Sequence, residues 1–169
     1  MPNQKISESQ IKQKQLWISF VVFIFLCLTV EIIGGLWTRE SVSTWYPTLV
    51  KPFWTPPDWI FGPVWSCLYI TIAVAGYLIY RAPSSHERSV ALILYGCQLG
   101  LNFIWSFLFF SLRNPTLGLI DIVLLCLFIS LTIIKAWTVR ALASLVLIPY
   151  LLWVMYATSL NAGIWVLNK

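Results

Sequence analysis

Charged residues are scarce in this chain of 169 amino acids: they make up 10% of it, where a soluble globular domain has about 25%. Histidine occurs once, as His86, within the polar segment RAPSSHER. GxGxxG, Walker, HExxH and nucleophile-elbow motifs are absent. These absences set aside a soluble globular class and ordinary nucleotide or hydrolytic chemistry, and no metal site is expected.

Metal or redox spacing of cysteines is also missing. The four cysteines fall one in each of the first four apolar runs, without a CxxC pair, which is typical of small core side chains. The net charge of +5 comes from basic residues scattered over the ends of these runs, so nucleic-acid binding is not expected. The cysteines are Cys27, Cys67, Cys97 and Cys126.

Long apolar runs dominate the remaining sequence, which is 59% hydrophobic with a mean hydropathy of +0.82. A helix crosses the hydrocarbon of a bilayer with about 20 apolar residues, and backbone polar groups must be satisfied inside it. The sequence therefore predicts an all-α, multi-pass integral membrane bundle of five transmembrane helices, after a polar N-terminal tail over residues 1–14. The single domain covers 15–167, with helices at about 15–37, 59–80, 89–112, 117–137 and 141–167.

The orientation follows weakly from the basic residues, of which seven lie on one side and four on the other. The larger group lies on the side of the N-terminus, which predicts that this end is inside. The first apolar run has no small-residue cleavage site, so we expect it to be retained as a helix. The two groups are Lys5, Lys12, Lys14, Arg81, Arg88, Lys135 and Arg140, and Arg39, Lys51, Arg113 and Lys169.

Residues 45–65, WYPTLVKPFWTPPDWIFGPVW, form the connector around which the chain is organised. Proline fixes φ and moves the preceding residue out of the helical region, so residues 51–57 are expected to be stiff and extended. Connectors of this length are usually lids, binding loops or disordered linkers, and the large aromatic rings argue against a solvated linker. Since its tryptophans can stack on a flat apolar ligand, the connector is predicted to act as a lid.

The third apolar run carries the clearest pattern. Gln98, Asn102 and Trp105 share one face, and amides in hydrocarbon must find partners or water, so this face is expected to look inward. Gly96 and Gly100 lie on the opposite face as a small-xxx-small pair, which predicts a homodimer through this helix.

Two further faces continue the aromatic pattern. Phe61, Trp65 and Tyr69 recur at four-residue spacing and are interpreted either as core or as cavity wall. In the last run, beyond a kink expected at Pro149, a second inward face mixes rings, a small residue and an amide. Its members are Tyr150, Trp153, Ala157 and Asn161.

Two acids lie within apolar runs. Glu31 is interpreted either as hydrated near the interface or as part of the cavity mouth, and Asp121 either as a structural hydrogen-bonding group or as a functional site. Aromatic walls with a few amides and acids indicate a site for a flat, largely apolar ligand.

The sequence resembles the tryptophan-rich sensory protein / translocator protein family, also called the peripheral-type benzodiazepine receptor. The resemblance rests on the connector, on LNFIWSFLFFSLR, on Asp121 and on PYLLWVMYATSLN, and it covers nearly all of residues 16–166. It implies a membrane receptor or sensor, most often of bacterial membranes for a chain of this type, that binds protoporphyrin IX, haem or related tetrapyrroles in tetrapyrrole regulation or stress response. Porphyrin or haem is then a ligand, and no cofactor is required.

By position, the resemblance implies that Trp54 and Trp153 are paired rings of the cavity. It implies that Trp65, Asn102, Trp105, Asp121, Ala157 and Asn161 line or support it. Two alternatives stay open: a light-dependent porphyrin-degrading enzyme, with Trp54 and Trp153 as its reactive residues, or a transporter of porphyrins and small apolar ligands.

Two departures from the family pattern concern the ligand. The animal cholesterol motif continues LN with tyrosines and an arginine, whereas here Leu160 and Asn161 are followed by AGIWV, so sterol binding is not expected at that site. Many members carry a tryptophan early in the fourth helix, where this chain has Leu117.

Overall fold

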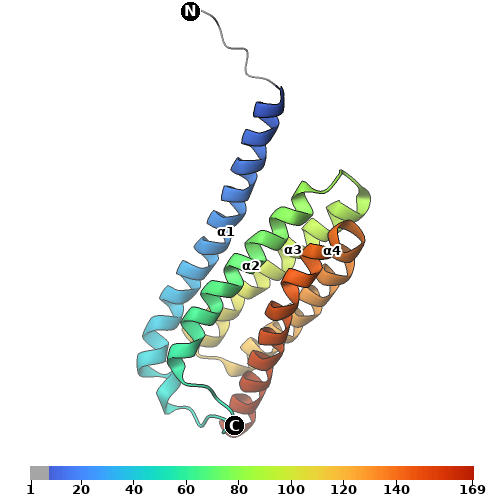
Figure 1. The fold of residues 1–169 in the computed structure, drawn as a ribbon. Helices are drawn as coiled ribbons and strands as arrows, with labels where there is room; N and C mark the ends of the chain where they lie inside the picture. Colours follow the sequence, from blue (N-terminus) through green and yellow to red (C-terminus); the bar gives the residue numbers. More distant parts are fainter. Residues whose placement is uncertain (1–7) are drawn as a thin grey trace, which may run out of the picture.

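The computed structural model describes residues 8–169, and over that range it contains helices and no strand. The predicted all-α class is confirmed. Four long helices run side by side over most of their length, and the last of them folds back on itself (Figure 1). The elements are α1 (Glu8–Thr44), the short helices η1 (Tyr46–Thr48) and η2 (Asp58–Ile60), α2 (Phe61–Arg81), α3 (His86–Ser106), the π-helical turn η3 (Phe107–Ser111) and α4 (Pro115–Leu167).

Helix α1 is longer than the sequence predicted, at both ends. Of the predicted tail, residues 1–7 lie outside the described part of the chain, and the helix has begun by Glu8. Its expected end at Trp37 was wrong because residues 38–44 contain no glycine or proline. The hydroxyls of Thr38 and Thr44 instead bond to carbonyls four residues earlier, each at 2.8 Å, which a helix tolerates.

Helix α4 is a helical hairpin of two limbs. Arg140 has non-helical backbone angles, φ −158° and ψ 95°, which break the helix between the expected boundaries 137 and 141. Asn161 Nδ2 donates to Pro115 O at 2.8 Å, although a straight helix of that separation would place them about 69 Å apart. The limbs therefore lie antiparallel, one orange and one red in Figure 1. Ser144 Oγ closes the turn by donating to Ile133 O at 2.7 Å.

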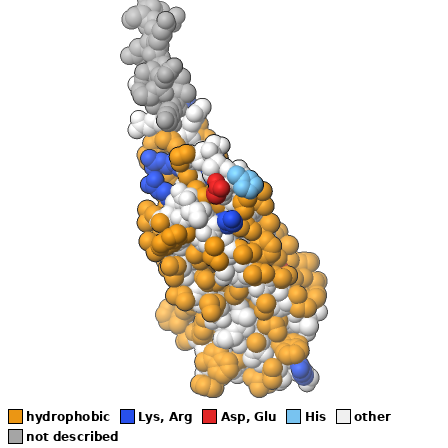
Figure 2. Space-filling model, turned by 90° about the vertical axis from the view of Figure 1, so that its right-hand side faces the viewer, with side chains coloured by type: hydrophobic (Ala, Val, Ile, Leu, Met, Phe, Trp, Pro, Cys, Tyr) orange, Lys and Arg blue, Asp and Glu red, His pale blue; other side chains and the backbone are white. Residues whose placement is uncertain are grey.

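The outer surface of the bundle is apolar. Within the described residues, four helices are long and apolar enough to cross a membrane: Gln13–Thr44, Asp58–Arg81, His86–Ser111 and Pro115–Leu167. Figure 2 shows a wide hydrophobic band on one face, with charged side chains gathered near its two ends. Large apolar side chains such as Phe25 (72% exposed) and Leu152 (61% exposed) are exposed on the bundle, as expected of residues that face lipid.

Close helix packing in the core depends on small residues. Gly76 of α2 lies where a Cβ would come within 2.5 Å of the Tyr95 ring of α3 and 2.7 Å of the Phe23 ring of α1. Tyr95 can approach so closely only because this position has no side chain, and its hydroxyl donates to Ile72 O at 3.2 Å. Small residues let membrane helices pack at short range in the absence of a hydrophobic driving force.

The proline-rich connector packs against the C-terminal end of α4. Val50 and Asn168 exchange two hydrogen bonds, N to Oδ1 at 3.0 Å and Nδ2 to O at 2.9 Å. Pro52 packs on Gly163, where a Cβ would be 2.4 Å from the proline ring. The connector is thus held against the same end of the bundle at which the C-terminus lies (Figure 1).

Candidate functional site

A cavity of about 410 Å³ lies between α1, α2, α3 and the second limb of α4, toward the connector end. Pockets that bind small molecules typically measure roughly 300–1,000 Å³. The lining combines eleven aromatic or aliphatic residues with eight polar or charged residues and three glycines. It consists of Glu31, Gly34, Gly35, Thr38, Arg39, Val42, Tyr46, Asp58, Phe61, Gly62, Trp65, Ser66, Tyr69, Asn102, Trp105, Ser106, Phe109, Phe110, Ala157, Leu160, Asn161 and Ile164.

One face of α1 forms a wall of this cavity. Its lining residues recur at three- and four-residue intervals from Glu31 to Val42, as expected of a single helix face. A Cβ added at Gly35, or at Gly62 on α2, would meet no atom within 4 Å. The hollow therefore owes part of its volume to glycines on two facing helices.

The two amide side chains in the lining, Asn102 and Asn161, form hydrogen bonds that join the walls of the cavity. Tyr69 Oη donates to Asn102 Oδ1 at 2.5 Å, and Asn102 Nδ2 donates to Tyr150 Oη at 3.1 Å. Asn161 accepts from Trp105 Nε1 at 3.3 Å while its Nδ2 bonds to the carbonyl of Pro115. Both amides therefore find partners inside the protein, which fixes the rings around the cavity.

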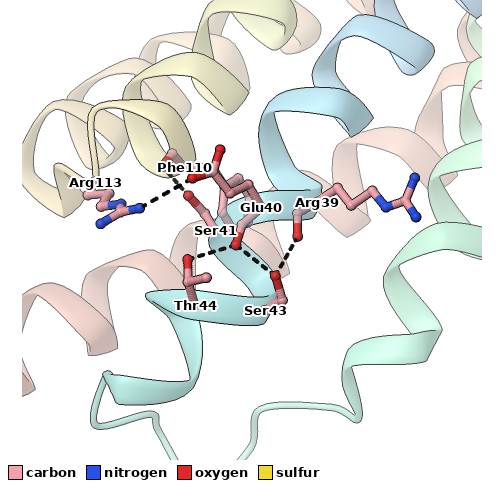
Figure 3. A network of polar contacts seen from close by, with 7 residues as sticks. All are labelled: Arg39, Glu40, Ser41, Ser43, Thr44, Phe110 and Arg113. Atoms are coloured by element: carbon pink, nitrogen blue, oxygen red, sulfur yellow. Dashed lines mark hydrogen bonds and ion pairs between the residues drawn. The ribbon is translucent and has the colours of Figure 1, made fainter.

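A π-helical turn shapes the aromatic side of the cavity. In η3 the Leu112 amide bonds to Phe107 O at 2.9 Å, five residues earlier. The consecutive rings of Phe109 and Phe110 are both buried against the lining, and Phe109 stacks on Trp105 at 5.3 Å and 18°. π-Turns are frequent at functional sites. Ser41 Oγ of α1 donates to Phe110 O at 2.6 Å and so ties this turn to the opposite wall (Figure 3).

The cavity brings together seven of the eleven residues predicted to bind ligand. The other four lie outside the lining, namely Trp54, Asp121, Tyr150 and Trp153. The seven are Phe61, Trp65, Tyr69, Asn102, Trp105, Ala157 and Asn161.

Trp54 and Trp153 lie at a neighbouring corner. Trp54 is 43% exposed and its carbonyl accepts from Tyr156 Oη at 2.8 Å, while the Trp153 ring lies 5.5 Å from the Tyr156 ring. Trp153 also packs edge-on against Phe61, 5.9 Å away, and Phe61 lines the cavity. Tyr156 thus contacts the backbone of Trp54 and the ring of Trp153, and the Trp153 ring packs on Phe61 of the cavity lining.

Tyr150 and Asp121 are buried behind the walls. Tyr150 is 0% exposed and supports the lining through Asn102 and through Trp65, whose ring is 6.4 Å away. Asp121 is 5% exposed, and its Oδ2 has no hydrogen-bond partner within residues 8–169.

The predicted dimer glycines are on the outer surface of α3. A Cβ at Gly96 or Gly100 would meet nothing within 4 Å, whereas Gln98 between them is 1% exposed. The glycine face and the amide face of α3 therefore point in opposite directions.

Sequence reasoning missed most of the α1 wall and two lining residues from the connector end, Tyr46 and Asp58. Lys51 lies 3.8 Å from Asp58 and 4.0 Å from the centre of the Tyr46 ring. Burial raises the pKa of Tyr46 to about 12, and the Asp58 charge adds to this effect, so the phenol stays neutral at physiological pH. The spacing of Glu31, Gly35 and Arg39 was the available signal, since residues four apart share a helix face.

The chain is similar along most of its length to proteins of one family. Residues 23–166 match the model of the TspO/MBR family. The chain belongs to the TspO/MBR family. Similar TspO/MBR proteins include the tryptophan-rich protein TspO of Archaeoglobus fulgidus, 41% identical over 89% of this chain and 97% of that protein. The tryptophan-rich protein TspO of Chlorobaculum tepidum is 43% identical over 89% of this chain and 96% of its own length.

Relatives in the TspO/MBR family extend to animals. The translocator protein of Bos taurus is 35% identical over 90% of this chain and 92% of that protein. The resemblance stated from the sequence is confirmed, and the apolar helices identify the chain as a multi-pass membrane protein of this family.

Proposed function

We propose that the chain crosses the membrane five times, with α4 providing two crossings, and that its cavity binds a tetrapyrrole such as protoporphyrin IX or haem as a membrane receptor or sensor. The broken helix at Arg140 supports the fifth crossing, because each antiparallel limb is long enough to span a bilayer. The connector, held on the end of α4, acts as the lid.

The aromatic walls are the observation that carries the ligand proposal. Trp65, Tyr69, Trp105 and Phe109 surround one hollow, and flat rings bind well in offset-stacked or edge-on arrangements against such side chains. Arg39 at the lining offers a cationic partner for a carboxylate substituent of the ligand.

Titration of the purified protein with protoporphyrin IX or haem tests this function. Bound porphyrin is expected to quench the emission of Trp65 and Trp105, which line the cavity. Gly35→Leu should fill the hollow and abolish saturable quenching, whereas Ala141→Leu, on an exposed position of α4, should not. Absence of quenching in the wild type, or unchanged quenching in Gly35→Leu, contradicts the proposal.

A photochemical role is the second candidate, because ring contacts connect Trp153 to Phe61 of the cavity wall. Illumination of the porphyrin complex would then change the porphyrin spectrum. Unchanged spectra rule this candidate out, and porphyrin flux into proteoliposomes above that of empty vesicles would instead favour a transporter.

A further inference from the structure

The two acidic residues that line the cavity differ in whether a cationic side chain lies near them. Three charged residues line it: Glu31, Arg39 and Asp58. Asp58 has Lys51 at 3.8 Å. The carboxylate of Glu31 accepts a hydrogen bond from Ser66 Oγ of α2, and no lysine or arginine whose side chain is described lies within ion-pair distance of it. Glu31 is thus the cavity acid without a cationic partner in the described chain.

The apolar surroundings of Glu31 make a carboxylate without a cationic partner costly in free energy. The residue is half-buried within the apolar span Gln13–Thr44, and a charge inside a membrane is stabilised by pairing or hydrogen bonding. Ser66 supplies one neutral donor, whereas a carboxylate can accept several hydrogen bonds. The group therefore has unused capacity to accept from a donor inside the cavity.

Aromatic rings beside Glu31 are also suited to a cation. Trp65 and Tyr69, on either side of Ser66 in α2, both line the cavity, and their rings lie 5.7 Å apart. Faces of tryptophan and tyrosine attract ammonium groups, more strongly where water is excluded. A carboxylate next to such rings is a suitable combination for a protonated amine.

Arg39 sets the direction of a bound ligand. It follows Glu31 by eight residues on α1, which corresponds to about 12 Å along the helix axis. Figure 3 shows its side chain directed away from Glu40 and Arg113, which form their own pair at 4.0 Å. A cation is repelled at the Arg39 end and attracted at the Glu31 end.

We propose that the cavity also binds flat apolar ligands that carry a protonated amine, with the ammonium group held by Glu31 beside Trp65 and Tyr69. The proposal rests on the ligand-binding role of this cavity, and it adds a class of ligand that the tetrapyrrole function does not require.

Pyrenemethylamine and pyrenemethanol test it, because the two share one flat fluorescent ring and differ in the charged group. Binding is measured by energy transfer from tryptophan to pyrene in nanodiscs of neutral phosphatidylcholine, with empty nanodiscs as the partition blank. We expect the wild type to bind the amine about tenfold more tightly than the alcohol, the effect of a hydrogen bond to a charged group.

Glu31→Gln is expected to bring the amine-to-alcohol ratio close to one while alcohol binding persists. Glu40→Gln is the matched control: it removes the same charge from α1, outside the cavity lining, and should keep the tenfold preference. Glu31→Asp retains the negative charge and should keep part of the preference for the amine. Circular dichroism and thermal unfolding show whether each variant is folded.

Several results would overturn the inference. If the wild type binds amine and alcohol about equally, the inference is wrong whatever the variants show. It is also wrong if Glu31→Gln keeps the preference for the amine, or if only Asp58→Asn loses that preference. Protoporphyrin titration separates the two proposals. Porphyrin binding without an amine preference contradicts this inference alone, whereas an amine preference without porphyrin binding contradicts the tetrapyrrole function alone.

Discussion

Trp105 Nε1 of α3 donates to Asn161 Oδ1 of α4 at 3.3 Å, and this hydrogen bond joins two faces of the cavity that are 56 residues apart in the sequence. Asn161 also holds the start of α4 through Pro115 O. One amide therefore fixes three parts of the chain around the cavity.

Loss of this hydrogen bond should weaken the fold and the cavity together. Trp105→Phe removes the donor, and Asn161→Ala removes both the acceptor of Trp105 Nε1 and the side-chain donor to the Pro115 carbonyl. We expect losses of about 0.5–2 kcal/mol for the first and more for the second. Denaturant unfolding in detergent micelles measures both. A double-mutant cycle of Trp105→Phe and Asn161→Ala that shows no coupling energy would contradict a hydrogen bond between the two residues.

The link between Ser41 and the π-turn should contribute to stability. Ser41→Ala removes the donor to Phe110 O, and a loss of about 1 kcal/mol is expected because that buried carbonyl loses its side-chain partner. Ser43→Ala is the matched control, since Ser43 is exposed and bonds only within α1 (Figure 3). Equal melting temperatures for the two variants would disprove this role.

Gly76 should tolerate no side chain. Gly76→Ala places a Cβ within 2.5 Å of Tyr95, so we expect a destabilisation of about 1–3 kcal/mol from overpacking. Gly96→Ala adds the same methyl group to open space on α3 and should stabilise the helix slightly or have no effect. Thermal unfolding monitored by circular dichroism compares the two. A neutral Gly76→Ala would show that α1, α2 and α3 are packed less tightly than described.

The outer glycine face of α3 predicts a homodimer. Gly96→Ile and Gly100→Ile should block close approach of a second copy and weaken self-association in bilayers. Energy transfer between fluorescently labelled copies of the chain in vesicles measures this self-association. Porphyrin binding should persist, because neither residue lines the cavity. Dimers that survive both substitutions would place the interface elsewhere.

Trp153 separates binding from photochemistry. Because its ring lies outside the cavity lining and packs on Phe61, Trp153→Phe should retain porphyrin affinity within about threefold. If the chain degrades porphyrin in light, the same variant should lose that activity. Full light-dependent activity in Trp153→Phe would remove this residue from the reaction, and a large loss of dark binding would place it in contact with ligand.

The sequence by itself determined the helical class, the membrane location and the inward faces of α3 and α4. Gln98, Asn102, Tyr150 and Asn161 are all buried, as their spacing predicted. In those helices polar groups are rare, and an amide avoids hydrocarbon by facing the protein interior. Asn102 and Asn161 find hydrogen-bond partners there, whereas the buried Gln98 amide has none among the described residues. The break near Arg140 was likewise marked by a polar gap between two apolar runs.

Only the tertiary structure decided that α1 forms a cavity wall and that Trp54 and Trp153 lie outside the lining. Apolar residues surround α1 on all sides, so their pattern does not indicate which side faces the bundle. The spacing of Glu31, Gly35 and Arg39 marks one helix face, and only the packed helices show that this face lines the cavity. The direction of Trp54 depends on how the connector packs on Gly163 and Asn168. Such contacts join residues more than 100 positions apart, which no local periodicity encodes.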